Sequence, residues 1–299
     1  MALKLHNRSG PSEAAIALAS KLAVAPQVAA DVQAMRDAYE VDFTIRAKRA
    51  LACHAVITKN ESINGRDCLI VEPADGEIDR TGLYLFGGGY VAGQPFFELP
   101  ILAPLVVQTR ARIVVPAYPL APEAPYPAAF EHVCAVYQAC INPTMFLAGE
   151  SAGGGLALAL AQHAVRQKGA LPAAMALFSP WVDLSAPAAA VEDPTLSEDF
   201  LNMAARAYAG GIDLWAAGLS PLQGVMAGLP PTILSTGTRD KLRNGVVALH
   251  QKLSAAGGEV EIHDWQGLWH VFEFYDELPE SMQSVTGIAR FLTRHQRQK

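Results

Sequence analysis

Short apolar runs alternate with helical patterns through most of this chain, and the alternation is its clearest structural signal. Apolar runs of strand length predict buried strands at 82–86, 112–116, 144–148, 174–179, 232–236 and 259–263. Segments of helical composition and spacing follow or separate them, at 97–109, 128–139, 152–167, 243–256 and 279–294. Strands that are apolar throughout and joined by helices indicate a parallel sheet covered on both faces. The pattern predicts an α/β fold with a mostly parallel central sheet flanked by helices.

The N-terminal quarter of the chain follows other patterns. Apolar residues recur at helical spacing over 12–50, in two pieces broken near Pro26. Such amphipathic helices must bury their apolar stripe, so we expect them to cover part of the main body. Residues 53–73 hold two β-type runs on either side of a polar turn region at 60–67, which predicts an antiparallel hairpin.

Late in the chain, a second region departs from the alternation of single strands and single helices. Two helix-like pieces, 195–208 and 220–226, stand between two strands where one helix is the rule. We interpret the interval at about 185–228 as an inserted cap. The chain is therefore divided into N-terminal helices at 1–50, which contribute to the cap, and a main domain at 51–299 that carries the insertion.

A serine occupies the junction between a predicted strand and a predicted helix. The segment 149–153 reads Gly-Glu-Ser-Ala-Gly, with an apolar run before it and an alanine- and leucine-rich segment after it. A turn this tight needs residues without a Cβ, so that neighbouring backbones can approach each other. Ser151 is thereby predicted to lie at the end of the sheet, beside the free N–H groups that begin a helix. The arrangement is typical of a nucleophilic serine.

A serine hydroxyl becomes a good nucleophile only when a base removes its proton and a third group orients that base. Of the eight histidines, only His270 follows a strand through a short loop. The orienting carboxylate is expected between Ser151 and His270 along the chain. Asp240 fits best, because it lies in the loop after a strand that ends at a glycine. Asp183 also follows a strand, but its cap-side neighbours favour a structural role.

Three consecutive glycines, Gly87 to Gly89, come directly after the first strand of the main alternation. Their backbone N–H groups are not covered by side chains, which suits stabilisation of a developing oxyanion. A simple flexible turn is the alternative interpretation.

The composition is that of a globular protein, with 51% hydrophobic and 17% charged residues. A formal net charge of −6 gives no electrostatic reason to expect nucleic acid or an anionic membrane surface as a partner. The four cysteines show neither metal-binding nor redox spacing, so we expect no metal and no cofactor.

The first residues superficially resemble a secretion signal, with two basic residues before an alanine-rich segment. Glu13, Lys21 and Pro26 interrupt that segment, and no run in the chain approaches the roughly 18 apolar residues of a membrane span. We therefore expect a cytoplasmic protein without a membrane partner.

The sequence resembles the hormone-sensitive-lipase-like carboxylesterases, a family with the α/β-hydrolase fold. The matching segments, in the family's order, are 87–90, 118–123, 126–129, 149–154, 179–184, 237–240 and 270–272. Two departures stand out. The family usually has histidine where this chain has Phe86, and it commonly has a proline at Lys241 and an acidic residue at Asn244. We expect these changes to affect substrate preference, loop rigidity or rate.

The resemblance implies a role for each matched site residue. A catalytic triad would comprise Ser151 as nucleophile, His270 as base and Asp240 as orienting acid. The backbone N–H groups of Gly88, Gly89 and Ala152 would form the oxyanion hole. The N-terminal helices and the insertion would together make a cap.

The implied activity is that of a serine carboxylesterase that works through an acyl-enzyme. Aromatic and apolar residues expected to line an enclosed pocket are Phe86, Tyr90, Phe200, Met203 and Trp215. Such a pocket favours small-molecule esters with short to medium acyl chains. A lactonase or amidase with the same residues is one alternative, and a non-catalytic small-molecule binder of the same fold is another. Members of the family are often dimers, so a homodimer is an expected possibility.

Overall fold

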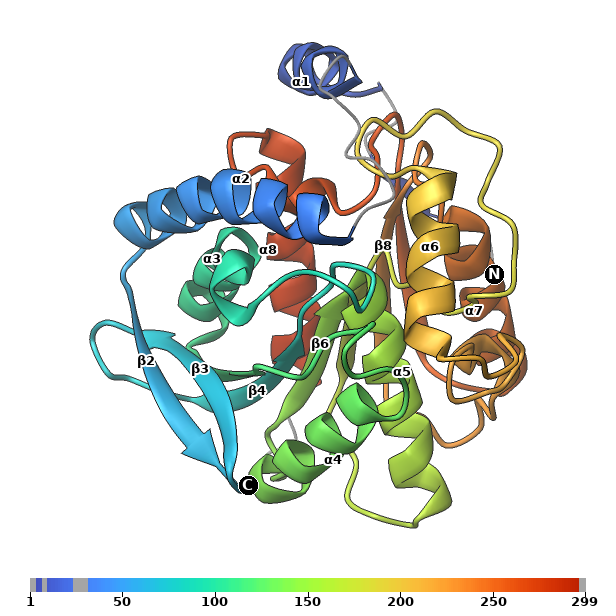
Figure 1. The fold of residues 1–299 in the computed structure, drawn as a ribbon. Coiled ribbons are helices and arrows are strands. Elements are labelled where there is room, and N and C mark those ends of the chain that lie inside the picture. Colours follow the sequence, from blue (N-terminus) through green and yellow to red (C-terminus); the bar gives the residue numbers. More distant parts are fainter. Residues whose placement is uncertain (1–3, 7–9, 24–31, 296–299) are drawn as a thin grey trace.

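The computed structural model describes residues 4–6, 10–23 and 32–295. Within them nine strands form one sheet in the order β1-β9-β8-β7-β6-β4-β5-β3-β2 (Figure 1). The strands are β1 (Lys4–His6), β2 (Val56–Ile63), β3 (Arg66–Pro73), β4 (Arg80–Leu85), β5 (Ala111–Pro116), β6 (Phe146–Glu150), β7 (Met175–Phe178), β8 (Thr232–Gly237) and β9 (Val260–Trp265). Neighbouring strands are parallel except at β3, which runs antiparallel to both β2 and β5. The predicted α/β fold with a mostly parallel sheet is confirmed.

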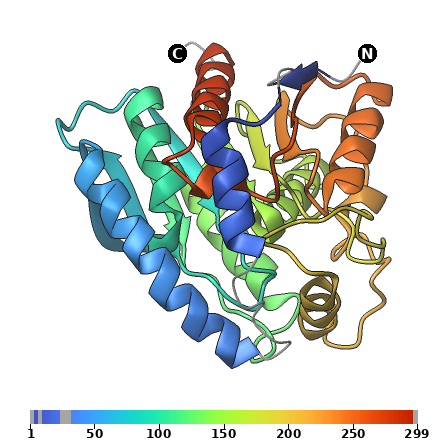
Figure 2. The same cartoon turned by 90° about the horizontal axis from the view of Figure 1, so that it is seen from above.

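Helices cover both faces of this sheet. They are α1 (Glu13–Ala23), α2 (Val32–Cys53), α3 (Leu99–Thr109), α4 (Ala128–Cys140), α5 (Ser151–Arg166), α6 (Glu198–Ala209), α7 (Arg243–Ala255) and α8 (Pro279–Arg294), with short 3-10 turns η1 (Pro95–Glu98), η2 (Pro221–Gln223) and η3 (Phe272–Phe274). Figures 1 and 2 show α3 and α8 together on one face, and α4 and α5 on the other. The central strands are therefore buried on both sides, which is why β6 and β7 are mostly apolar without alternation.

Several predicted boundaries need correction. The hairpin forms, but its turn is only Asn64-Gly65, since Ile63 pairs with Arg66. The polar residues around the turn belong to the strands because β2 is an edge strand with one solvent face. Within the insertion, the second helix-like piece is no more than the η2 turn. Strand β1 was not predicted, and Pro26 lies outside the described residues.

The N-terminal helices and α6 lie over the edge at which the parallel strands end (Figure 1). Helix α6 begins at Ser197, whose hydroxyl accepts a hydrogen bond from the backbone N–H of Phe200 at 3.1 Å. This is an N-cap, and the acidic first turn and the left-handed Gly210 at the other end complete the signals that bound the helix. Its buried face includes Phe200, so the helix presents an aromatic ring toward the main domain.

One arginine of helix α2 makes three contacts with the segments that follow the glycine triplet and β5. Arg36 donates from Nε to the carbonyl of Val91 at 2.8 Å and from a second nitrogen to the carbonyl of Ala121 at 3.0 Å. The same guanidinium forms an ion pair with Glu123 at 2.8 Å. Because Val91 follows the glycine triplet closely, this contact couples the N-terminal cap to that loop.

Candidate active site

Ser151 stands at a sharp turn between β6 and α5. The strand ends at Glu150 and the helix begins at the serine itself, whose φ of 51° lies in the left-handed region that residues with a Cβ rarely adopt. One helical turn after the serine, the backbone of α5 passes very close to β4, and only a residue without a Cβ fits there. A Cβ added at Gly153 would collide with the carbonyl oxygen of Leu85. The serine side chain is thereby held at the end of the sheet, as the sequence predicts.

The structure brings the three predicted triad residues together. His270 Nε2 lies 2.9 Å from Ser151 Oγ, and His270 Nδ1 lies 3.0 Å from Asp240 Oδ1. Asp240 is fully buried, and its two oxygens also accept hydrogen bonds from Leu242 N–H at 2.8 Å and from the Thr236 hydroxyl at 2.9 Å. The carboxylate is therefore fixed on three sides, and the imidazole is aligned between it and the serine.

Interactions between charged groups shift the pKa values of His270 and Asp240 in the direction opposite to the effect of burial. Burial of the imidazole disfavours its charged form, but the carboxylate of Asp240 and two further acidic groups outweigh this, so the pKa of His270 is raised above 6.5. Burial also acts to raise the pKa of Asp240, yet its attraction to His270 and its hydrogen bonds leave that pKa lowered. Asp240 stays ionised at neutral pH, and the neutral imidazole becomes the major form only above its raised pKa.

Asp193, in the cap segment before α6, connects the loops of the triad. Its Oδ2 atom accepts hydrogen bonds from the backbone N–H groups of His270 and Lys241, both at 3.2 Å. Its Oδ1 atom accepts from the N–H groups of Thr195 and Leu196 at 3.0 and 3.2 Å. The sequence analysis missed this residue because its partner His270 is 77 positions away and nothing local marks the contact.

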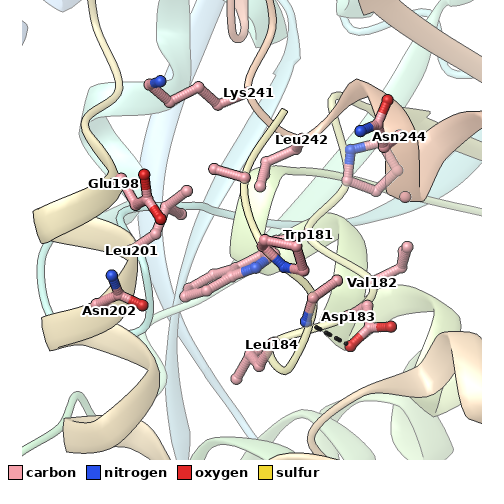
Figure 3. A pocket seen from close by; sticks show the side chains of 15 residues that line it. Trp181, Val182, Asp183, Leu184, Glu198, Leu201, Asn202, Lys241, Leu242 and Asn244 are labelled. Atoms are coloured by element: carbon pink, nitrogen blue, oxygen red, sulfur yellow. Dashed lines mark hydrogen bonds between the residues drawn. The ribbon is translucent and has the colours of Figure 1, made fainter. Parts of the chain in front are cut away.

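Asp183, the alternative orienting acid, lies elsewhere. It lines a separate pocket of about 50 Å³ between α6 and the loop after β8 (Figure 3). Its Oδ1 atom accepts hydrogen bonds from the N–H groups of Ser185 and Ala186 at 3.0 and 3.2 Å, and Oδ2 accepts one from the Gln223 side chain at 2.9 Å. These contacts give Asp183 a structural role in the segment that follows β7. Asn244, where the chain departs from the family pattern, lines this same pocket.

The glycine triplet forms a loop beside Ser151. Gly88 and Gly89 have φ values of 91° and 64°, and a Cβ at Gly88 would collide with the carbonyl of Ala92. Phe86, in place of the family's histidine, stacks on Tyr118 with ring centroids 3.9 Å apart. The Tyr118 hydroxyl donates a hydrogen bond to the carbonyl oxygen of Phe86. Tyr118 therefore contacts both the ring and the backbone of the residue that begins the loop.

We expect Tyr118→Phe to weaken the loop without changing its shape. The substitution leaves the buried carbonyl of Phe86 without its donor, which costs about 1–3 kcal/mol of folding stability. It should also lower kcat, measured alongside denaturant unfolding. Tyr137→Phe is the matched control, since its hydroxyl donates to the carbonyl of Ala170 at 2.7 Å, away from the loop. Equal kcat values in the two variants would contradict a role for Tyr118 in the loop.

A cavity of about 350 Å³ opens in front of Ser151 and His270. The glycine loop forms one wall, and aromatic rings form much of the rest: Tyr39, Phe43, Phe97, Phe200, Phe274 and Tyr275. Acidic side chains also reach the lining, from Asp42, Glu98 and Glu150. The cavity is enclosed by α2 on one side and by the segment leading into α6 on the other.

Only Phe200 of the five predicted pocket residues lines this cavity, where its ring packs directly against Gly89. Phe86 stacks on Tyr118, as described above. Tyr90 turns away at a φ of 65° and stacks on Tyr208 with centroids 3.7 Å apart. Met203 packs against the core outside the lining, and Trp215 is 62% exposed. Nearness along the chain to the loop or cap was thus a poor guide to side-chain direction.

The aromatic residues of α2 were missed as site residues, although the amphipathic pattern of 12–50 predicted a covering helix. Their helical spacing indicated a buried stripe but not which part of the body it covers. No group of His, Cys, Asp and Glu side chains able to hold a metal ion occurs among the described residues. In the same part of the chain, no helix is both long and apolar enough to cross a membrane.

Known proteins resemble this chain in both sequence and structure. A family model described as the alpha/beta hydrolase fold matches residues 82–274. An acetyl-hydrolase of Streptomyces hygroscopicus is 35% identical over 225 residues, covering 71% of this chain and 75% of the relative. The crystal structure of one esterase has a TM-score of 0.84 and 26% identity, over 97% of this chain and 96% of the other. An esterase of the bacterial hormone-sensitive lipase family has a TM-score of 0.81 and 27% identity, over 95% and 97%.

The sheet topology, the turn at Ser151 and the family match define an α/β-hydrolase, and the chain belongs to that family. Within it, the protein is a carboxylic ester hydrolase of the hormone-sensitive lipase family.

Proposed function

We propose that Ser151, His270 and Asp240 are the catalytic triad of this esterase. The supporting observation is the continuous pair of contacts from Asp240 Oδ1 through the imidazole to Ser151 Oγ, at 3.0 and 2.9 Å. The geometry is that of a nucleophile joined to its base, with the base oriented by a buried carboxylate.

Ester hydrolysis then proceeds in two steps. Ser151 Oγ attacks the ester carbonyl carbon while its proton passes to His270 Nε2, and the alcohol leaves with that proton. Water next attacks the acyl-enzyme, giving a proton to His270, and the acid departs as Ser151 recovers it. The negative oxygen formed in each step is stabilised by the backbone N–H groups of Gly88, Gly89 and Ala152, which we assign as the oxyanion hole.

The substrates we propose are esters with short to medium acyl chains. A cavity of about 350 Å³ is near the lower end of the range for small-molecule sites, and its walls are mostly aromatic. The acetyl-hydrolase among the relatives is named for a short acyl group, which supports the same proposal. Lactonase or amidase activity on the same residues is the second candidate. The cytoplasmic location and a homodimer stay predictions.

Acyl preference is tested with p-nitrophenyl esters of increasing chain length. We expect kcat/KM to be highest for the short esters and to fall as the chain outgrows the cavity. Phe200→Ala should move the optimum to longer chains, because it enlarges the wall beside Gly89. Met203→Ala, on the same helix but outside the lining, is the matched control and should leave the profile unchanged. A preference for long chains in the unmodified protein would overturn the proposed substrate class.

A further inference from the structure

Two carboxyl groups face each other behind the glycine loop. Glu150 precedes the serine and is 1% exposed, and Glu98, at the end of η1, is 3% exposed. Both side chains reach the lining of the active-site cavity, and each carboxyl group influences the pKa of the other. Glu150 Oε1 accepts a hydrogen bond from the backbone N–H of Gly87, the first glycine of the loop. The pair therefore touches both the serine turn and the glycine loop.

The groups around Glu98 and Glu150 disfavour a negative charge on both carboxyl groups at once. The Oε2 atom of neither acid receives a hydrogen bond from a nitrogen donor of the described residues. The titratable groups that face the pair are Tyr39 from α2, Tyr84 from β4, Tyr118 from the segment after β5, and His270. No lysine or arginine is among these groups. Two buried carboxylates without a cation repel each other, and a hydrogen bond between carboxyl oxygens itself requires a proton.

We propose that Glu98 and Glu150 retain a proton between them at neutral pH, and that this protonated pair positions Gly87 and hence the oxyanion loop. Glu98 O–H donates to Glu150, and the second oxygen of Glu150 holds the Gly87 N–H. Both acids are positioning residues, since they act on the reacting atoms through the loop. The inference rests on the proposed function, because it assigns a task to the loop that we identify as the oxyanion hole.

The pH dependence has a defined sign. Burial raises the pKa of both carboxyl groups, and interaction with Glu150 raises the pKa of Glu98 further. Interaction with Glu98 opposes the rise in the pKa of Glu150, but burial outweighs it. The folded protein therefore binds more protons than the unfolded chain at neutral pH. The resulting stability is complete below the unfolded carboxyl pKa and is lost as the pH rises through the raised value. We expect Tm to fall from neutral to alkaline pH, and to fall less in Glu98→Gln.

The proton is tested directly by infrared spectroscopy of the protein at pH 7. The carbonyl band of a protonated carboxyl group should be present in the unmodified protein and weaker in Glu98→Gln, which cannot hold the shared proton. Glu72→Gln is the matched control, because Glu72 is buried but lies 2.9 Å from the Lys59 ammonium. Its substitution should leave the band unchanged. A band equally strong in the unmodified protein and Glu98→Gln, or absent from both, overturns the proposal.

The positioning role is tested by kinetics at two substitutions of Glu150. Glu150→Leu removes the acceptor for Gly87 N–H, and we expect kcat to fall about 10²-fold with little change in KM, the size of losing one oxyanion donor. Glu150→Gln retains an acceptor oxygen and should restore most of that loss. Equal kcat values in the two variants would contradict the role. If Glu150→Leu does not fold, the infrared comparison still decides whether the proton is present.

Failure of this inference is distinguishable from failure of the proposed function. If Ser151→Ala is inactive while the infrared band is unaffected by Glu98→Gln, the triad assignment stands and the carboxyl pair does not hold the proton. If Ser151→Ala keeps full activity, the proposed function itself is wrong.

Discussion

Replacing Ser151 with alanine is expected to lower kcat for ester hydrolysis by about 10⁶-fold, the loss measured when another serine hydrolase lost its nucleophile. The reason is that, within residues 4–6, 10–23 and 32–295, Ser151 carries the hydroxyl that contacts the base. His270 Nε2 is 2.9 Å from Ser151 Oγ, and without that oxygen no acyl-enzyme forms. The residual rate should reflect only binding of the ester and stabilisation of the oxyanion during attack by water.

The measurement is release of p-nitrophenol from a short-chain ester, with the spontaneous rate subtracted. Ser62→Ala, on the exposed edge strand β2, is the control for a serine-to-alanine change and should retain full activity. A folded Ser151→Ala protein that hydrolyses the ester as fast as the unmodified enzyme would show that another residue is the nucleophile.

Asp240→Asn should lower kcat by about 10⁴-fold although it changes only one atom type. The oxygens of Asp240 accept hydrogen bonds from Leu242 N–H and the Thr236 hydroxyl as well as facing His270. Leu242 N–H and His270 Nδ1 both contact the Oδ1 atom, so an asparagine keeps its oxygen there and turns its NH₂ group toward the Thr236 hydroxyl. The imidazole then keeps its orientation but loses the carboxylate charge that stabilises the imidazolium formed when His270 takes the proton of the serine.

The pH profile distinguishes this effect from simple misfolding. In the unmodified enzyme the acid limb of kcat/KM should lie above pH 6.5, because the pKa of His270 is raised by Asp240 against the opposing effect of burial. Removing the carboxylate charge lowers that pKa, so the remaining activity of Asp240→Asn should have its acid limb at lower pH. Asp183→Asn is the matched control and should leave both kcat and the limb unchanged. If Asp183→Asn lowered kcat and moved the acid limb while Asp240→Asn did not, Asp183 would be the orienting acid.

This chain has Phe86 where the family usually has histidine, and other residues form hydrogen bonds to the start of the glycine loop. Phe86 cannot donate the hydrogen bond that a histidine side chain offers, but its own carbonyl accepts one from Tyr118 and its ring stacks on the same residue. The next N–H, from Gly87, is held by Glu150. In this chain two residues distant in the sequence, Tyr118 and Glu150, therefore contact the start of the loop.

The arrangement of the triad was predictable because of a general property of parallel sheets. Ser151, Asp240 and His270 each follow a strand, and the strands β6, β8 and β9 all end at the same edge. Residues that follow parallel strands must therefore approach one another, whatever the details of packing. The choice of Asp240 over Asp183 also depended only on local sequence, and the hydrogen bonds of the two carboxylates agree with it.

The pocket was predictable only in part. The prediction relied on nearness along the chain to the glycine loop and the cap, and the structure places Phe200 in the cavity lining but not Phe86 or Tyr90. Tyr39 and Phe43 line the cavity from α2, more than a hundred positions before the serine in the chain. Their place depends on how α2 docks, and part of that docking is made by Arg36 through backbone carbonyl groups that have no sequence signature.

Taken by itself, the sequence determined the fold class, the strand-turn-helix at Ser151 and the chain order of the triad, because hydrophobic periodicity and turn chemistry are local properties. Only the tertiary structure decided which rings enclose the cavity, that Asp193 connects the triad loops, and that Glu98 faces Glu150. Those contacts join distant segments through side-chain direction and burial, and neither quantity is encoded in any short stretch of the chain. The two members of the carboxyl pair in particular come from η1 and from the end of β6, which are far apart in the chain.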